Sequence, residues 1–233
     1  MKSLWFNIFA FTVMAGATVA AEIKPFTATY QIERSGDAVG EATISLHPIG
    51  GGKWKYITES KAQVFLFAYR DTETSVVTWK GDNVIPQSFI REREYPTRLT
   101  RTEQQFDWAT KIENGNKDEK KQWKLLLEDD VQERHSHTLM LRRDLRAGAT
   151  TMQYRISDGG KLRYYKYIVS GEELVNTPAG EFKTLKVERD RDDDNTRQTI
   201  TWFAPDLDFM PVKLRQIEDG KVQADMLLKK IEM

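Results

Sequence analysis

The sequence predicts an all-β fold, mainly antiparallel, built as a single curved sheet or open β-barrel with one short helix. Apolar and polar residues alternate with a period of two in about a dozen segments, which is typical of half-buried antiparallel strands. Tight-turn signals separate these segments, including the dipeptides Asn114-Gly115, Asp158-Gly159 and Asp219-Gly220. One short stretch, residues 137–146, has helical spacing instead.

Residues 1–21 have the pattern of a secretory signal peptide. Lys2 gives a positive start, an apolar run covers residues 4–13, and small residues continue to Ala21. The run is shorter than the ~18 residues that a membrane span needs, so we expect cleavage after Ala20 or Ala21 and no transmembrane segment in the mature chain. The expected location is the periplasm, or the outside of the cell if the source has no outer membrane.

Residues 22–233 are expected to form a single β-rich domain. In the first strand, Phe26, Ala28, Tyr30 and Ile32 share one face, and a turn at 35–37 leads to the second strand. The same alternation predicts further strands at residues 42–46, 54–59, 73–80, 84–94, 98–108, 120–127, 151–157, 162–170, 182–189, 197–203, 211–218 and 221–231. We expect no linker between them, because turn signals recur without a Pro/Ser-rich break.

The predicted helix follows a possible metal motif. Leu139, Met140, Leu141 and Leu145 lie among basic residues, and Gly148 ends the segment, which we expect to plug or cover one open end of the barrel. Just before the predicted helix, His135-x-His137 has carboxylates nearby and would make a metal site on a strand, where residues i and i+2 share a face. Because this stretch precedes a helix, we interpret it as an exposed polar loop and expect no metal.

The segment 91–105 has charged residues on both predicted faces. Our first interpretation is a solvated edge hairpin, whose opposite charges pair across the strands and discourage aggregation. The alternative is a polar wall that receives an anionic head group through Arg91, Arg93, Arg98 or Arg101.

The segment 64–69 is the longest unbroken apolar run after residue 21. It is either a central strand or loop packed into the barrel, or a mouth lined by Phe65, Phe67 and Tyr69 that admits an apolar chain or a partner. Tyr165 and Tyr167, on a strand that is aromatic on both faces, would extend this lining. These aromatic residues, with Arg91 and Arg93, are the candidate ligand-binding residues.

Composition excludes several functions. Lys and Arg number 35 and so do Asp and Glu, which argues against nucleic-acid binding, and the absence of Cys excludes disulfides and thiolate chemistry. The sequence has no nucleophile elbow, phosphate-binding glycine loop, zinc-protease motif or dinucleotide fingerprint. We therefore expect no catalytic residues, no cofactor and no enzymatic activity.

Three stretches of the sequence are similar to those of a known family: residues 26–30 with 39–42, residues 177–184, and residues 202–207 with 210–214. In this order and spacing they resemble a bacterial family of secreted periplasmic proteins classed as a domain of unknown function. The resemblance spans nearly all of the expected mature chain. It implies a periplasmic β-rich fold and brings no catalytic residues.

The function expected from these observations is binding. A non-enzymatic periplasmic protein of the cell envelope would hold a lipid-like or apolar ligand, or an envelope partner, in the concavity of its barrel. Two alternatives remain open: a scaffold for envelope assembly that uses an exposed strand edge, and a hydrolase acting on envelope material, which needs clustered carboxylates with perturbed pKa values.

Overall fold

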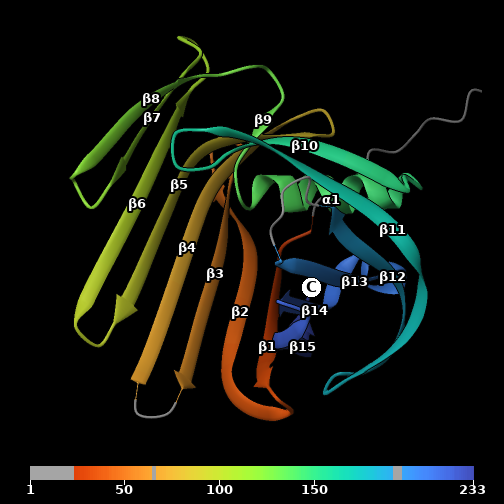
Figure 1. Ribbon diagram of the computed structural model, residues 1–233. Coiled ribbons are helices and arrows are strands. Elements are labelled where there is room, and N and C mark those ends of the chain that lie inside the picture. The colour runs from red at the N-terminus through yellow and green to blue at the C-terminus, as the bar shows by residue number, and fades with distance from the viewer. Residues whose placement is uncertain (1–23, 65–66, 191–195) are drawn as a thin grey trace, which may run out of the picture.

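The computed structural model describes residues 24–64, 67–190 and 196–233. Within these ranges most residues lie in strands, with one α-helix and one 3₁₀ helix (Figure 1). The elements in chain order are β1 (Phe26–Arg34), β2 (Asp37–Gly50), β3 (Lys53–Val64), β4 (Phe67–Lys80), β5 (Asn83–Tyr95), β6 (Arg98–Asp107), β7 (Ile112–Lys117), β8 (Lys121–Leu126), β9 (Val131–Gln132), α1 (Ser136–Arg146), β10 (Thr151–Ser157), β11 (Leu162–Thr177), β12 (Gly180–Asp190), β13 (Gln198–Ala204), η1 (Pro205–Leu207), β14 (Met210–Glu218) and β15 (Lys221–Glu232).

All the strands belong to one 15-stranded sheet in the order β8-β7-β6-β5-β4-β3-β2-β1-β15-β14-β13-β12-β11-β10-β9. Neighbours pair antiparallel, except that β9 runs parallel to β10. The sheet curves round on itself in Figure 1, but β8 and β9 at its two ends do not pair, so the barrel is open. The predicted fold class is confirmed.

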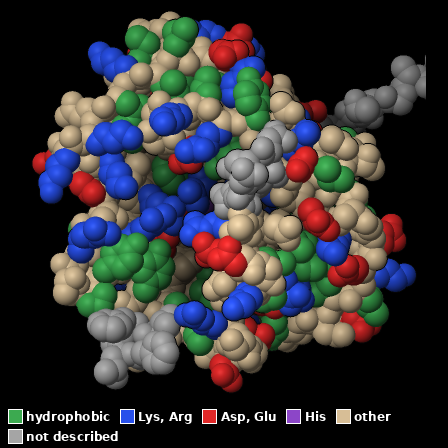
Figure 2. Space-filling view, in the orientation of Figure 1, with side chains coloured by type: hydrophobic (Ala, Val, Ile, Leu, Met, Phe, Trp, Pro, Cys, Tyr) green, Lys and Arg blue, Asp and Glu red, His purple; other side chains and the backbone are tan. Residues whose placement is uncertain are grey.

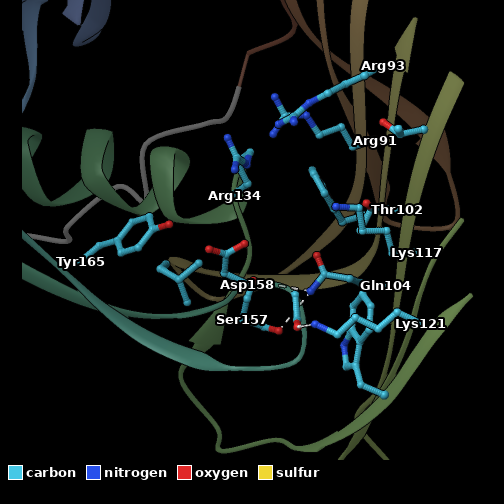
Figure 3. A pocket seen from close by; sticks show the side chains of 15 residues that line it. Arg91, Arg93, Thr102, Gln104, Lys117, Lys121, Arg134, Ser157, Asp158 and Tyr165 are labelled. Carbon is cyan, nitrogen blue, oxygen red and sulfur yellow. Dashed lines mark hydrogen bonds between the residues drawn. The ribbon is translucent and has the colours of Figure 1, made fainter. Parts of the chain in front are cut away.

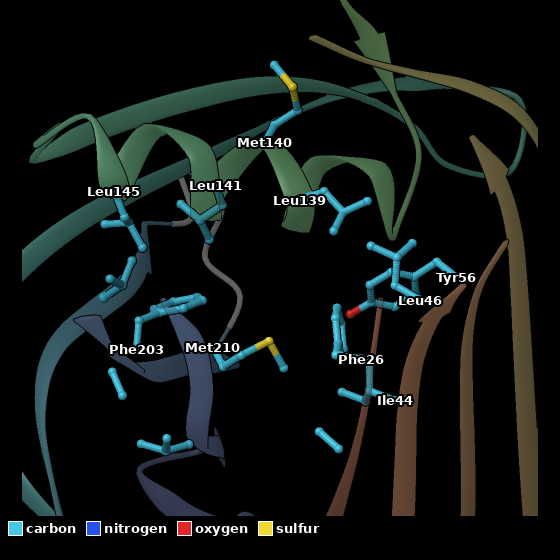
Figure 4. Close-up of a cluster of buried hydrophobic side chains, with 14 of the residues drawn as sticks. Phe26, Ile44, Leu46, Tyr56, Leu139, Met140, Leu141, Leu145, Phe203 and Met210 are labelled. Carbon is cyan, nitrogen blue, oxygen red and sulfur yellow. The ribbon is translucent and has the colours of Figure 1, made fainter. Parts of the chain in front are cut away.

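Helix α1 lies across the concave side of the sheet (Figure 1). Its residues Leu139, Leu141 and Leu145 are buried and belong to the same apolar cluster as Phe26 and Phe203 of the strands (Figure 4). Burying a side chain of this size stabilises the fold by about 1.5–3 kcal/mol. The space between the helix and β1, β2, β13 and β14 is therefore filled by side chains. None of the described helices is long and apolar enough to cross a membrane.

Asn114-Gly115, predicted as a hairpin turn, lies instead inside β7, and this prediction is wrong. Gly115 pairs directly with Trp123 of β8. A Cβ atom on Gly115 would lie 2.0 Å from the Trp123 ring, so the ring fills the space that a side chain would need. The turn comes later, at Asp118 and Glu119, which both have positive φ. A glycine that receives a cross-strand aromatic ring has the same sequence signature as a turn glycine.

The interpretation of segment 91–105 as an edge hairpin is also wrong. Strand β6 pairs with β7, which pairs with β8, so the β5–β6 hairpin lies inside the sheet. One face of this hairpin, which carries Arg91, Arg93 and Gln104, lines a cavity between the two ends of the sheet. The alternate residues Glu92, Arg101 and Glu103 form ion pairs with one another on the opposite face.

Candidate anion-binding site

A cavity of about 230 Å³ lies where the two ends of the sheet approach each other. Strands β5 to β8 form one wall of the cavity. The opposite wall is formed by the β10–β11 turn, by Tyr165 of β11 and by Arg134, which lies just before α1 (Figure 3). The space-filling view shows this place as a hollow with Lys and Arg side chains on its visible walls (Figure 2).

Side chains, rather than backbone ladders, hold the two ends of the sheet together. The Gln104 amide on β6 donates to Oγ of Ser157 on β10 (3.0 Å) and to the buried carboxylate of Glu113 on β7 (2.9 Å). The indole N–H of Trp123 donates to the same Glu113 oxygen (2.8 Å), and its ring packs against Gly160 in the β10–β11 turn. This polar seam forms the floor of the cavity.

The alternation of the strands places the cationic residues. Phe89, Arg91 and Arg93 share one face of β5. Across the sheet, Arg91 pairs with Thr102 of β6, which pairs with Lys117 of β7, and Lys117 in turn pairs with Lys121 of β8. A single cross-strand row therefore carries three cations from β5 to β8, all lining the cavity. Arg93 and Arg134 complete the set of cations.

Arg91 is held by carboxylates behind the cavity wall. Its Nε lies 2.8 Å from Glu73 and 2.9 Å from Asp71, and the side chain is only 16% exposed. Burial lowers the pKa of Arg91, but its hydrogen bond to Asp71 and the charges of Glu73 and Asp71 have the larger effect and raise it. Arg91 is therefore a fixed positive charge.

Glu73 is the centre of a buried charge cluster. One of its carboxylate oxygens lies 3.1 Å from Nε2 of His135, and the other is 3.7 Å from Arg134. Burial raises the pKa of Glu73, but the hydrogen bond and charge of His135 and the charges of Arg134 and Arg91 together lower it to about 2. Glu73 thus stays ionised and lies within ion-pair distance of the guanidinium group of Arg134.

The expectation that His135 and His137 lie in an exposed polar loop is wrong, since both are buried. The carboxylate of Glu133 accepts hydrogen bonds from the backbone N–H groups of His135 and Ser136 (2.8 Å each), which turns the chain inward at the start of α1. His135 then stacks on Tyr56, with ring centroids 4.7 Å apart. In the described part of the chain, no group of three or more His, Asp or Glu side chains could hold a metal ion.

The remaining cations of the cavity are less compensated. Among the described residues, no carboxylate lies within ion-pair distance of Lys117 or Lys121; Lys121 approaches the carbonyl oxygen of Gly159 at 3.4 Å. Nε of Arg93 is buried without a hydrogen bond, at 3.5 Å from an Asp71 oxygen.

The cavity has an excess of positive charge. Five cations line it, together with one carboxylate, Asp158, which is paired with Arg163 at 3.2 Å. Asp71, Glu73 and Glu113 lie just behind the wall and supply three negative charges when ionised. The five cations therefore keep an excess of at least two positive charges, before any charge on His135 beside Glu73 is counted, which suits an anion with more than one negative charge.

The comparisons with known proteins place the chain in a family. Residues 26–227 match DUF3108, whose description is "Protein of unknown function". The chain belongs to this family. The match confirms the resemblance to a domain of unknown function, and no curated protein matches the sequence.

Among solved structures, the DUF3108 chain is similar to a protein from Bacteroides fragilis described as exported and as having a YmcC-like fold. The two share 12% sequence identity over 89% of this chain and 95% of that one, with a TM-score of 0.33.

Three of the candidate ligand-binding residues meet in the cavity of this DUF3108 protein: Arg91, Arg93 and Tyr165. Tyr69 is not among the residues that line the cavity, and its hydroxyl donates a hydrogen bond to Asp71 (2.9 Å). Burial and then the charge of Asp71 raise the pKa of Tyr69 to about 12. Tyr167 bonds to Nε2 of His137 and packs against the core. Phe65 lies outside the described residues, and Phe67 is the first residue of β4.

Sequence reasoning missed Lys117, Lys121 and Arg134. The two lysines flank the turn between β7 and β8, which the Asn114-Gly115 signal placed too early in the chain. Arg134 reaches the cavity only because the chain turns inward at Glu133. If period-two alternation is followed through residues 113–117, Glu113, Gly115 and Lys117 lie on one face of a strand, and this pattern would have predicted the position of Lys117. Of the other arginines of the predicted polar wall, Arg101 is engaged by Glu92 and Glu103, and Arg98 lies over the Tyr95 ring.

Proposed function

We propose that this protein is a non-enzymatic binding protein of the bacterial cell envelope and that it holds the anionic group of its ligand in the cavity at the seam of the barrel. One observation carries the proposal: Lys117 and Lys121 face each other across β7 and β8, beside Arg93 and Arg134. Neither lysine has a carboxylate partner among the residues that the structure describes. Like charges directly opposite each other destabilise a sheet, and a bound anion removes that cost.

Of the ligand chemistries considered from the sequence, the anionic head group of the polar-wall alternative has more support than an apolar ligand inside the barrel. The apolar interior is packed by α1 and the strands, whereas the cavity is lined mainly by polar and cationic groups. The proposed ligand therefore inserts its anionic group. An apolar portion would lie outside, near the ends of the hairpins, where Tyr69 and Tyr95 pack at 5.3 Å and Leu99 is 59% exposed.

Binding has more support than hydrolysis. The one carboxylate that lines the cavity, Asp158, is ion-paired with Arg163, and Glu73 has a strongly lowered pKa, the reverse of a general acid. His137 is buried in the core, where burial above all lowers its pKa to about 3. The charges of this cavity are arranged to attract an anion and not to transfer a proton.

The described sheet edges give less support to a scaffold. Strand β9 has only two residues, and β8 carries Lys121 and Lys124 along its free edge. Short edge strands and edge lysines discourage the addition of another strand. The envelope location rests on the signal-peptide pattern of residues 1–21, which lie outside the described residues.

Native mass spectrometry of the protein from its own cells tests this proposal. The protein is released from the periplasm without detergent, sprayed intact, and then extracted for negative-ion analysis. We expect a stoichiometric anionic molecule with the wild type and with the control K124Q, and its loss from K117Q/K121Q. Equal recovery with all three proteins, or recovery of the protein only from the cytoplasm, would overturn the proposal.

A further inference from the structure

The cavity is too small for a complete lipid or a large cofactor. Pockets that enclose drug-sized ligands measure about 300–1,000 Å³, whereas this cavity measures about 230 Å³. Its occupant is therefore a compact charged group, either a small free anion or the head group of a larger molecule.

The cations surround the cavity from more than one side. Arg93 projects from β5, Lys117 and Lys121 come from β7 and β8, and Arg134 faces them from the segment before α1 (Figure 3). A carboxylate presents two oxygens in one plane, which one guanidinium can satisfy in a bidentate pair. A tetrahedral phosphoryl group presents three terminal oxygens in different directions, which suits donors that converge from opposite walls.

The charge also matches. The cavity has an excess of two positive charges when Asp71, Glu73 and Glu113 are counted against the five cations. A phosphate monoester carries about −1.5 to −2 at pH 7, whereas a carboxylate or a sulfate monoester carries a single negative charge. Thr102, between Arg91 and Lys117 in the cross-strand row, adds a hydroxyl that can donate to a phosphoryl oxygen.

We propose that the group bound in this cavity is a phosphate monoester, held between Arg93, Lys117 and Lys121 of the β5–β8 wall and Arg134 of the opposite wall. This inference rests on the proposed function and names the ligand class of the same site. Phosphate can come from a soluble metabolite or from a phosphorylated lipid, and both present the same terminal phosphoryl group to these four residues.

Isothermal titration calorimetry with phenyl phosphate and phenyl sulfate tests the ligand class. The two probes share shape and ring and differ in charge at pH 7.5. We expect phenyl phosphate to bind about tenfold more tightly, because one additional charge-assisted contact contributes about 1.4 kcal/mol, which is tenfold in Kd. Affinity for phenyl phosphate should also fall as salt concentration rises.

Matched variants locate the site. K117Q/K121Q should weaken phenyl phosphate binding at least about tenfold, and R93Q should weaken it similarly. The control K124Q lies three residues from Lys121 on β8, outside the cavity lining, and should bind like wild type. Circular dichroism and the urea midpoint verify that each variant is folded, so a loss of affinity reports on the site.

The outcomes separate this inference from the proposed function. If phenyl sulfate binds as tightly as phenyl phosphate, or if neither binds although the protein retains an anion from its cells, the phosphate assignment is overturned and the binding function stands. If no anion is retained and neither probe binds, both fail. Decyl phosphate binding more tightly than inorganic phosphate supports a lipid source, and equal affinities support a soluble phosphate; either result upholds phosphate recognition.

Discussion

Replacement of Gly115 by alanine tests how the barrel is held at its seam. The new Cβ would lie 2.0 Å from Cε2 and 2.3 Å from Nε1 of Trp123, so the indole ring has to move. Movement breaks its 2.8 Å hydrogen bond to the fully buried Glu113. Overpacking costs about 1–3 kcal/mol, and a lost hydrogen bond to a charged group costs about 1.5–3 kcal/mol. We expect Gly115→Ala to lower the free energy of unfolding by about 3 kcal/mol, the lower part of the combined range, because the half-buried ring can relax.

Urea unfolding followed by far-UV circular dichroism measures this effect, with Trp123→Ala and the double variant in parallel. The three atoms nearest to the new methyl group all belong to the indole ring, so Gly115→Ala should cost far less in the Trp123→Ala background. The coupling energy of the cycle should therefore be about 3 kcal/mol, of the size expected for residues in contact. Equal m-values are required for the comparison. Additive single effects would refute the assignment of Trp123 as the seam residue.

Three further predictions concern buried polar groups. Burial lowers the pKa of His137 to about 3, so this residue is neutral in the folded protein over most of the pH range. The free energy of unfolding should therefore fall as the pH decreases from about 6.5 to 3, and His137→Phe should flatten that part of the pH–stability curve. The pKa of Glu73 in the folded protein, about 2, lies below its ordinary value of 4.5. Glu73 therefore contributes about 3 kcal/mol of stability, which is complete above pH 4.5 and is lost as the pH falls towards 2. Glu73→Gln should remove this pH dependence. Tyr30→Phe should cost about 1–3 kcal/mol in thermal or urea unfolding, because the buried Tyr30 hydroxyl donates to the carbonyl of Pro211 at 2.9 Å.

The fold was predictable from the sequence wherever one face of a strand is apolar. In β1, Phe26, Ala28 and Tyr30 are buried in alternation, and the turn at Ser35 and Gly36 falls where the sequence places it. The prediction failed at β7, whose concave face carries Glu113, Gly115 and Lys117. These residues are stabilised by a partner strand and a tryptophan ring, neither of which leaves a local signal.

The candidate site was predictable only in part, for a related reason. Arg91 and Arg93 stand out because charged residues occupy both faces of a strand, and Tyr165 because its strand is aromatic on both faces. Arg134 and Lys121 join them through contacts between segments far apart in the chain, such as Gln104 with Ser157. Sequence periodicity describes one strand at a time and cannot show which strands meet when an open sheet curves round.

The cations of the cavity should lower the free energy of unfolding of the ligand-free protein, because they repel one another. Lys117 and Lys121 are paired directly across β7 and β8, and like charges in that position destabilise a sheet. In phosphate-free buffer, K117Q/K121Q should therefore unfold at a higher urea concentration than the wild type. A ligand at a hundred times its Kd adds about 2.7 kcal/mol of stability, so saturating phenyl phosphate should reverse the order. If the double variant is the less stable protein in both buffers, the lysines serve the fold and the argument for an anion site fails.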